Sequence, residues 1–360
     1  EIDAKVITAS QSRKSDVITR VTPGIEFGYR SEPFTLLASY DFDAEIFAKN
    51  TKLTQPQARQ RGGLHFAYQP TRIWTLGFTG EYLETERPQD LNVTTGISGE
   101  RERSRGYSFL PSFTYRFNPL TSALARYTYS RNESTQAITV DEIATTNETR
   151  NDEHEAGIVF ERHLTSKDRG SLTYGFRHFI SDGALLTNLS GNGHETSSSH
   201  LFSLGWVREL SALTTLSLRG GPRFSRGDVA PEVEGALTRR FRRGEASFAY
   251  GRTQNIAVGR SGPVETESYL GSLSYQFLSR FTLRANPAYY INNGEDTKTK
   301  VYRLDLSGVY SINPWLSLQG IYRFSFERES GPVLRSADRG DRYRNVVFVE
   351  LTAAPEYRLW

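Results

Sequence analysis

Apolar and polar residues alternate with a period of two along almost the whole chain. In "NPWLSLQGIYRFSFERE" (Asn313–Glu329), every second residue after the proline is apolar or small, and the residues between are polar except for Ile321. The same alternation occurs in residues 34–48, 74–84, 106–117, 170–179, 201–210, 214–227, 244–253, 269–278, 281–292 and 302–312. This pattern predicts strands with one apolar face and one wet face. No segment shows a convincing helical period.

The connections between these strands are of two kinds, which alternate. Short ones rich in turn residues lie at 30–33, 69–72, 118–121, 165–170, 210–214, 242–245, 278–280 and 313–314. Longer polar ones lie at 85–104, 131–152, 181–199, 257–267, 292–300 and 329–342, and only the connection around Asp228 is short on that side. With Ala4–Ser10 as the first strand, the pattern predicts about 18 strands, an even number, with both termini on the short-turn side.

The composition excludes several other kinds of protein. The chain of 360 residues is 37% hydrophobic, with a mean hydropathy of −0.52. It has no apolar run of about 18 residues, so no transmembrane helix is expected. Its 12% aromatic content is too high for a disordered chain. Cysteine is absent, which excludes disulfides and thiolate metal sites and fits an oxidising compartment. The net charge of +3 argues against nucleic acid as a partner. Residues 1–10 show no signal peptide, so we expect a mature or trimmed form.

One architecture explains the strands, the turns and the loops together. Strands of about 12–15 residues are longer than most strands of soluble sheets, and about 9–11 tilted residues cross a bilayer. Short turns on one side and long loops on the other are typical of outer-membrane barrels, and a sheet in lipid must close on itself. We therefore predict one all-β domain over residues 1–360. It is a closed antiparallel transmembrane β-barrel with short periplasmic turns, longer extracellular loops, an apolar outer face and a water-filled lumen.

The four tryptophans favour the same geometry. Trp74 and Trp315 closely follow short turns, Trp206 lies four residues before one, and Trp360 is the last residue. All four map to the short-turn side, where an interfacial aromatic belt is expected. The alternative is four unrelated core tryptophans in a soluble sandwich, which long strands with such asymmetric loops disfavour.

Four prolines break the rule that strand interiors avoid this residue. Pro23, Pro111, Pro222 and Pro287 fall inside predicted strands, on the lipid-facing parity. Each removes a hydrogen-bond donor from the sheet, so we expect local bulges or kinks. The alternative is that strand pairing ends nearby and the donor would be unpaired in any case.

Two stretches resemble known outer-membrane proteins. The final "PEYRLW" resembles the C-terminal signal that the barrel-assembly machinery reads, although Arg358 and Glu356 occupy positions where that signal has apolar residues. "SDVITRVTPGIEFGYR" followed by "FTLLASYDFDAEIFA" resembles the opening hairpin of a β-barrel porin family, whose members are often encoded beside exopolysaccharide-synthesis genes. The resemblance implies integral insertion in a bacterial outer membrane, contact with lipid and lipopolysaccharide, and passage of a glycan. Periplasmic polysaccharide-export proteins or a lipoprotein are the implied partners.

No motif for catalysis or metal binding is present. The chain has no HExxH, GxSxG or GxxxxGK[ST] motif, so we expect neither an enzyme nor a cofactor. His194, Glu195 and His200 lie together in a predicted loop. A solvated loop is favoured over a weak metal site there, and no metal is predicted.

The charged parity is where the sequence points to function. Inward positions carry both signs of charge, which suits a hydrophilic solute, and about 16–18 strands leave an aqueous channel. The alternative for each residue is a wet wall of paired charges. We expect segment 85–104, segment 131–152 or another protein to constrict the lumen, and an inward tyrosine to stack on sugar rings. The predicted lumen residues are Arg116, Arg126, Arg177, Arg219, Arg223, Arg240, Arg284, Arg303, Arg323, Glu81, Asp305 and Tyr290.

Three functions remain open at this point. The first is an outer-membrane channel for an exopolysaccharide or oligosaccharide, in which clustered arginines hold sugar hydroxyls and carboxylates. The second is a general diffusion porin. The third is a scaffold barrel that does not conduct and houses a lipoprotein, a cytochrome or a component of a surface machine.

Overall fold

The computed structural model describes residues 2–6, 14–49, 51–97, 103–140, 143–183, 194–225, 227–258, 262–294, 297–330 and 341–353. This part is nearly all β, with two short 3₁₀ turns, η1 (Thr51–Leu53) and η2 (Pro88–Asp90). The strands are β1 (Ile2–Val6), β2 (Lys14–Val21), β3 (Gly24–Ser31), β4 (Phe34–Phe47), β5 (Gln55–Tyr68), β6 (Trp74–Thr85), β7 (Arg103–Asn118), β8 (Thr121–Val140), β9 (Ile143–His163), β10 (Asp168–Gly183), β11 (His194–Ser211), β12 (Thr214–Ser225), β13 (Asp228–Phe241), β14 (Gly244–Ile256), β15 (Pro263–Leu278), β16 (Phe281–Asn293), β17 (Lys298–Asn313), β18 (Leu316–Ser330) and β19 (Arg342–Ala353).

These strands form one antiparallel sheet whose two ends meet. From β4 onward each strand pairs with the next, and β1 pairs with β19 on one side and β2 on the other. β2 and β3 both pair with β4, so they are two halves of one bent strand. Counted this way the barrel has 18 strands, as predicted, although its first strand is Ile2–Val6. Among the described residues, β3 and the part of β19 after Val347 each pair on one side only, so β1 alone joins the ends.

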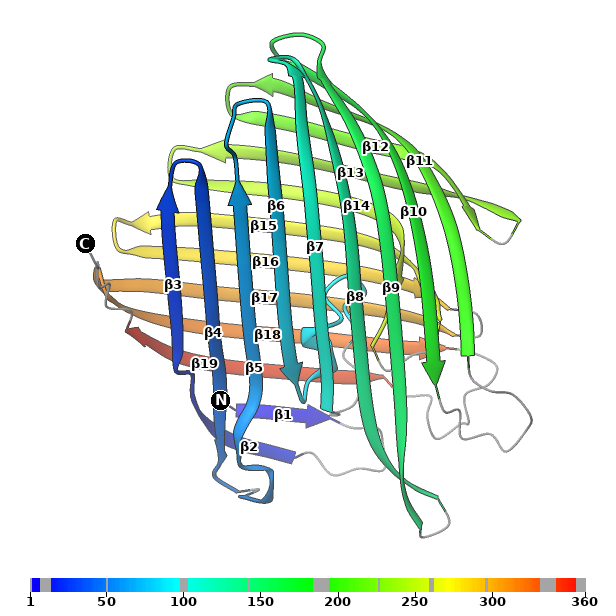
Figure 1. Cartoon of the computed structure of the whole chain (residues 1–360). Helices are drawn as coiled ribbons and strands as arrows, with labels where there is room; N and C mark the ends of the chain where they lie inside the picture. The colour runs from blue at the N-terminus through cyan, green and yellow to red at the C-terminus, as the bar shows by residue number, and fades with distance from the viewer. Residues whose placement is uncertain are drawn as a thin grey trace.

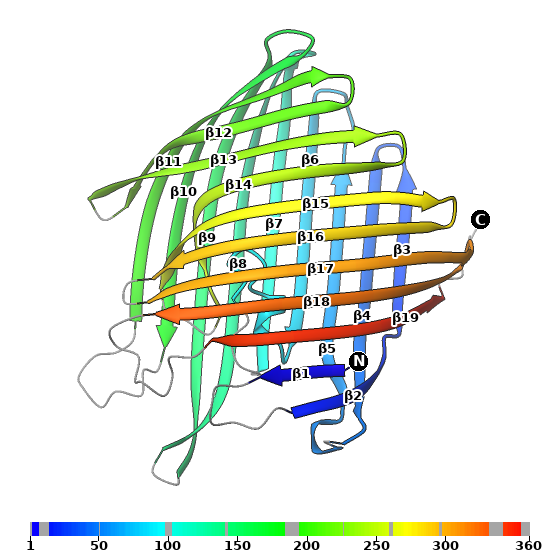
Figure 2. The ribbon, with the colours of Figure 1, turned by 180° about the vertical axis from the view of Figure 1, so that it is seen from behind.

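The barrel has two walls whose strands cross. Strands β3–β10 run steeply in Figure 1, and β12–β19 run across behind them. Figure 2 shows the same crossing from the other side. Tilted strands on opposite walls of one barrel must cross in this way. The short turns lie at one end of every strand pair and the longer connections at the other. No helix in the described part of the chain is long and apolar enough to cross a membrane.

The two faces of the sheet differ as the alternation predicts. On neighbouring strands β10 and β11, Leu172 and Leu204 face outward and are 55% and 69% exposed. Thr173 and Ser203 face inward and are only 5% and 3% exposed. Large apolar side chains are thus left on the outside of the barrel, where a soluble protein would not tolerate them. A lipid environment removes that cost.

The prediction about segment 131–152 is wrong. Nearly all of it belongs to strands β8 and β9, which pair from Thr121–Arg162 to Val140–Ile143 and project well beyond the wall at the long-loop end (Figure 1). Residues 131–135 and 149–152 are polar at every position, so these stretches lack the apolar–polar alternation that marks the other strands and resemble a loop in sequence. The segment therefore does not enter the lumen.

The prolines interrupt pairing without shifting it. On one side of Pro111, Pro222 and Pro287 the ladder skips two positions and resumes in the same register, while pairing on the other side is continuous. The expected bulges are therefore absent at these three positions, because each strand turns its missing donor toward a single neighbour. Pro23 is different, since β2 ends at Val21 and β3 begins at Gly24, which gives the expected bend.

Aromatic residues gather at both ends of the outer wall. Trp74 opens β6 and Trp315 lies in the turn before β18, and the Trp206 indole nitrogen donates to Asp168 Oδ1 at 3.1 Å. Trp360 lies outside the described residues. A second row on the long-loop side, which the sequence analysis missed, has neighbouring ring centroids 4.4–6.0 Å apart. It consists of Tyr250, Tyr269, Tyr289, Tyr302, Phe326 and Tyr343.

Candidate lumen constriction and transport path

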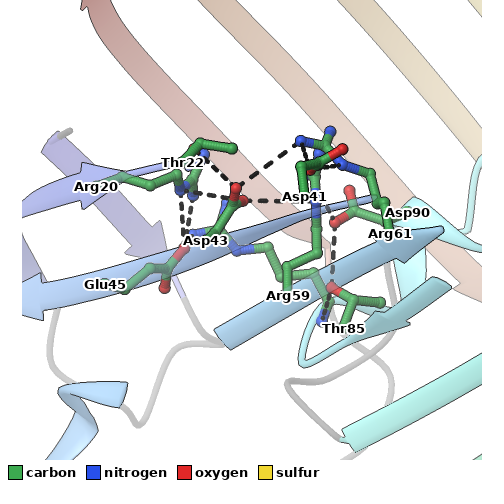
Figure 3. A network of polar contacts seen from close by, with 10 residues as sticks. Arg20, Thr22, Asp41, Asp43, Glu45, Arg59, Arg61, Thr85 and Asp90 are labelled. Atoms are coloured by element: carbon green, nitrogen blue, oxygen red, sulfur yellow. Dashed lines mark hydrogen bonds and ion pairs between the residues drawn. The ribbon is translucent and has the colours of Figure 1, made fainter. Parts of the chain in front are cut away.

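A dense charge network lines the inner face of β2, β4 and β5 near the long-loop end (Figure 3). Arg20 Nη2 contacts Glu45 at 2.6 Å and Arg20 Nε contacts Asp43 at 3.5 Å. Arg59 Nε also lies 3.5 Å from Asp43. Asp43 and Glu45 are 2% and 3% exposed, so their charges depend on these partners. Removing one partner of such a buried pair is costly, because the other charge loses its compensation.

Residues 86–97 leave the wall after β6 and enter the lumen. Arg87 Nη2 contacts Glu45 at 2.9 Å, and Arg59 Nη1 contacts Asp90 at 3.3 Å, so the charge network anchors the start of this segment. Thr85 also donates to Asp90 at 3.2 Å. The expectation that segment 85–104 enters the lumen is therefore confirmed for residues 86–97, and residues 98–102 lie outside the described part.

A second segment enters the lumen at the tip of the β14–β15 hairpin. Pairing between β13 and β14 stops at Val233–Arg252, whereas β14 and β15 stay paired as far as Ile256–Pro263. The freed tip bends inside against β10, which is not a neighbour of β14 in the sheet. Arg177 Nη1 donates to the Gln254 carbonyl at 2.8 Å, and the Gly262 amide donates to Ser181 Oγ at 3.1 Å.

The two inward segments bind each other. Asn92 Oδ1 accepts the Val258 amide at 2.7 Å, and Asn92 Nδ2 donates to the Val258 carbonyl at 3.4 Å. A small apolar core lies beside this contact and contains Ile97, Ala257, Val264, Tyr290 and Val301. We call residues 86–97 together with the described residues 254–258 and 262–264 the plug. It spans the lumen from β4 and β5 to β14–β17.

A glycine allows the plug to seat against the wall. Gly96 has φ +67°, a conformation that favours glycine, and a Cβ there would lie 2.4 Å from the Tyr290 ring. The Tyr290 hydroxyl donates to the Val93 carbonyl at 3.3 Å, and Asn292 donates to the Thr95 carbonyl at 2.8 Å. Tyr290 faces inward as predicted but is only 6% exposed. Its ring is covered by the plug, so the expectation that it stacks on sugar rings does not hold in this arrangement.

A narrow basic chamber of about 30 Å³ lies between the plug and strands β17–β19. Four guanidinium groups, from Arg87, Arg303, Arg323 and Arg344, face two carboxylates, from Asp90 and Asp305. Gln89, Ser325, Val346 and Phe348 complete the lining that faces the lumen. Asp305 is shared, since Arg303 and Arg323 each lie 3.7 Å from it. The Arg323 guanidinium also stands 5.6 Å from the centre of the Phe348 ring. We call this group the arginine chamber.

A wider cavity of about 510 Å³ opens beside the plug residues Val93 and Thr94. Its wall combines apolar residues with small polar ones, which include Ser171, Ser217 and Ser268. Arg219 and Glu234 project into it and form an ion pair at 2.9 Å. Ser171 and Ser217 lie near the short-turn ends of β10 and β12, so the cavity extends from the plug toward the periplasmic side.

The remaining predicted lumen residues all lie on the inner face. Some are held in ion pairs within the wall and the plug, and others face the open lumen. Arg126 and Arg177 share Glu155, at 2.9 and 3.1 Å. Arg223 is 5% exposed and contacts Glu232 at 3.1 Å and Glu265 at 2.6 Å, so it secures the hairpin tip. These three arginines hold the wall and the plug together, which corresponds to the alternative of a wall of paired charges.

Other predicted residues face open lumen. Arg240 contacts Glu245 at 3.2 Å near the short turns. Arg116 and Arg284 make no ion pair with a residue in the described ranges. Glu81 is exposed on the inner face of β6. The histidines expected in a loop lie on strand β11 instead, where alternation turns His194 and His200 outward and Glu195 inward. Within the described ranges, no three metal-binding side chains come together.

Sequence reasoning missed the plug anchors Arg59, Arg87 and Asn92, and the chamber residue Arg344. The only sign of a role for Arg87 and Asn92 was that both lie in the long connection 85–104, which was expected to constrict the lumen. A further signal was available, because the apolar residues Ile97 and Val258, which are buried, lie in connections that are otherwise polar. Apolar residues in a polar loop indicate a surface that the loop covers.

Comparison with known proteins agrees with this architecture. A family model described as "Oligogalacturonate-specific porin protein (KdgM)" matches residues 252–359. No curated protein sequence matches the chain. Among solved structures, the FrpB iron transporter from Neisseria meningitidis is 10% identical with a TM-score of 0.50, and the match covers 90% of this chain and 64% of that one. A mutant of the ferric enterobactin receptor PfeA from Pseudomonas aeruginosa is 9% identical with a TM-score of 0.51, covering 97% and 71%.

These similarities support conclusions of different kinds. At such low identity the solved structures show the fold alone, and the chain spans less than two thirds of the length of FrpB. The porin family model covers the wall from the second half of β14 to β19. The named proteins are porins and transporters, which carry solutes. The chain is therefore an integral β-barrel of the bacterial outer membrane, of the type that porins and transporters share.

Proposed function

We propose that this barrel is an outer-membrane channel for acidic oligosaccharides, and that the solute passes through the arginine chamber. The observation that carries the proposal is the gathering of four guanidinium groups around Asp90 and Asp305 in the narrow space beside the plug, where Arg87 also contacts Glu45. Guanidinium stays charged at all physiological pH values and forms forked hydrogen bonds with carboxylates. An acidic sugar chain offers one carboxylate per unit, and each carboxylate would bond these guanidinium groups in turn.

The family similarity supports the same substrate class. The matched family is described as specific for oligogalacturonate, a chain of sugar acids. The matched residues 252–359 include Arg303, Arg323 and Arg344, three of the four chamber arginines. The fourth, Arg87, comes from the plug, so wall and plug together form the binding surface.

The plug makes passage conditional. It crosses the lumen between β4 and β16, so a general diffusion porin with a permanently wide lumen is disfavoured. In our proposal the plug shifts when a solute enters, and the Asn92–Val258 contact holds the closed arrangement. A scaffold barrel would also tolerate a plug but would have no use for an arginine-lined passage beside it.

The same proposal extends to an acidic exopolysaccharide, which is a longer solute of the same chemical class. Export of a polymer would require periplasmic export proteins or a lipoprotein at the short-turn end, in addition to the lipid, the lipopolysaccharide and the barrel-assembly machinery that integral outer-membrane barrels use. Deleting the gene distinguishes export of a polysaccharide from uptake of oligosaccharides. Loss of surface polysaccharide would support export, whereas unchanged polysaccharide with loss of growth on acidic oligosaccharides would support uptake.

Planar-bilayer recording tests the proposal directly. We expect a trisaccharide of galacturonate to block the conductance in a concentration-dependent way, and a neutral trisaccharide to block far less. Replacing Arg303 and Arg323 by glutamine should weaken the block by at least tenfold, since a hydrogen bond to a charged group contributes about 1.5–3 kcal/mol and 1.4 kcal/mol is a factor of ten. Arg240→Gln, an exposed inward arginine near the short turns, is the matched control. Equal block by both sugars would refute the proposal.

A further inference from the structure

A hollow of about 630 Å³ lies on the outer wall of the barrel, on the side away from the lumen. Strands β6–β10 form it toward their long-loop ends. Its apolar part contains Phe78, Phe109, Pro111 and Tyr127. Its polar part contains Arg131, Arg150, Asp152 and His154. A pocket that faces lipid yet carries two arginines is not explained by transport through the lumen.

The strand register orders these side chains along the membrane normal. Phe78 pairs with Pro111 at the level nearest the middle of the strands. Phe109 pairs with Tyr129 one step toward the long loops. Arg131 pairs with Asp152 a further step along. The hollow therefore runs from apolar to charged in the direction in which the outer leaflet passes from acyl chains to headgroups.

A missing side chain deepens the hollow at its centre. Gly80 stands opposite Phe109 on β6, and a Cβ added there would meet the Phe78 ring at 3.3 Å and the Phe109 ring at 3.7 Å. The Phe109 and Tyr129 rings are stacked with their centroids 6.4 Å apart. The aromatic rings thus line a groove instead of closing over it.

The charged end gathers two guanidinium groups, from Arg131 and Arg150, around Asp152, and Glu133 Oε1 lies 3.9 Å from Arg131 Nη1. Arg131 Nε and Nη2 both bond Asp152, the latter at 3.2 Å, and Arg150 Nε donates to the same carboxylate at 2.9 Å. Arg131 is held further by the rings of Tyr107 and Tyr129, at 5.8 and 5.9 Å. The Arg150 side chain remains 45% exposed. Arg150 uses only one edge of its guanidinium on Asp152, so its outer N–H groups can bond an added anion.

We propose that this hollow binds the phosphorylated lipid A part of lipopolysaccharide. A lipid A phosphate would bond Arg150 and Arg131, and an acyl chain would lie over Phe109 and Pro111. The long-loop side faces the outer leaflet, so an anionic lipid in that leaflet meets both halves of the site at once. Because the hollow lies outside the barrel, the proposal does not depend on what passes through the lumen.

Arg208 provides a matched control for the charged end. It also faces outward and lies 3.8 Å from a carboxylate, that of Asp168, with 48% of its side chain exposed. It stands at the short-turn end of the barrel, where the inner leaflet lies. A lipid that any outward arginine could recruit would respond equally to loss of Arg208 and Arg150.

The test measures lipid binding to the folded barrel in detergent by native mass spectrometry. The probes are bisphosphorylated lipid A, dephosphorylated lipid A, phosphatidylglycerol and inorganic phosphate. We expect bisphosphorylated lipid A to bind tightest and Arg150→Gln to weaken it about tenfold, the loss of one charge-assisted hydrogen bond. Arg208→Gln should leave the binding unchanged.

Three results would overturn the proposal. Equal binding of dephosphorylated lipid A would remove the role of the phosphate. Equal binding of phosphatidylglycerol would leave a general anionic-lipid surface, and binding of inorganic phosphate alone with the same affinity would leave no role for the apolar groove. Because these comparisons use the unmodified barrel, they decide the matter even if Arg150→Gln fails to fold.

Discussion

Replacing Asn92 by alanine should open the plug. The Asn92 side chain accepts the Val258 amide at 2.7 Å and donates to the Val258 carbonyl at 3.4 Å. Asn92 is 0% exposed and Val258 is 4% exposed, so little water reaches either group while the plug is closed. Alanine removes both hydrogen bonds and leaves the backbone groups of Val258 without this partner. The ion pairs that anchor Arg87 and Asp90 are untouched.

The expected size of the effect follows from these contacts. A hydrogen bond contributes about 0.5–1.5 kcal/mol net, and a buried group left without a partner costs about 1–3 kcal/mol. The short bond carries most of this, so the closed arrangement should lose about 2 kcal/mol relative to an open one. Since 1.4 kcal/mol is a factor of ten, the ratio of open to closed time should rise roughly 30-fold.

Single-channel recording in planar bilayers measures that ratio. The matched control is Asn286→Ala, which removes an exposed asparagine from the inner face of β16 without touching the plug. We expect the control to behave like the unmodified barrel, and Asn92→Ala to spend far more time open. If the two variants and the unmodified barrel have the same open fraction and conductance, the plug does not gate the channel. Heat-modifiable migration on gels confirms that each variant has folded.

The remaining predictions concern topology, facing and packing. Because the chain has no cysteine, Asp228→Cys on the long-loop side should be labelled by an impermeant maleimide in intact cells, and absence of labelling would reverse the orientation. Leu172→Arg places a charge on the lipid face about 5 Å from the level of Trp206, so it should destabilise the barrel in lipid by about 1–2 kcal/mol. Ser171→Arg should fit the inner cavity and cost little. Equal losses of stability in urea titrations would show that the assignment of these two residues to opposite faces is wrong. Gly221→Ala should cost at least 1–3 kcal/mol in the same titrations, because its Cβ would lie 1.8 Å from the Phe202 carbonyl, and Gly320→Ala, with open space around it, should be neutral.

The barrel itself could be predicted from the sequence, because the physics that encodes it is local. A strand with lipid on one face and water on the other must alternate with a period of two, and each residue carries its own share of that signal. Leu318 and Ser317 illustrate it, since neighbours in the chain have opposite polarity and lie on opposite faces. Turn residues such as those around Asn118 mark where each strand ends. The number of strands, the direction in which each side chain faces and the closure of the sheet follow from these local facts. The sheet must close because the bilayer core has no water to hydrogen-bond the backbone groups of an open edge.

The plug could not be predicted in the same way, because its contacts join residues far apart in the chain. Asn92 and Val258 are 166 positions apart, and Arg87 reaches Glu45 across 42 positions. A polar connection reads the same whether it stays in water above the barrel or folds into a wet lumen, since both surroundings satisfy its backbone. The direction of residues 86–97 and of the β14–β15 tip is therefore decided only when the closed barrel brings opposite walls together. Closure of the barrel also places Arg223 in a structural ion pair with Glu232 and Glu265, and it leaves Arg303 and Arg323 facing the passage.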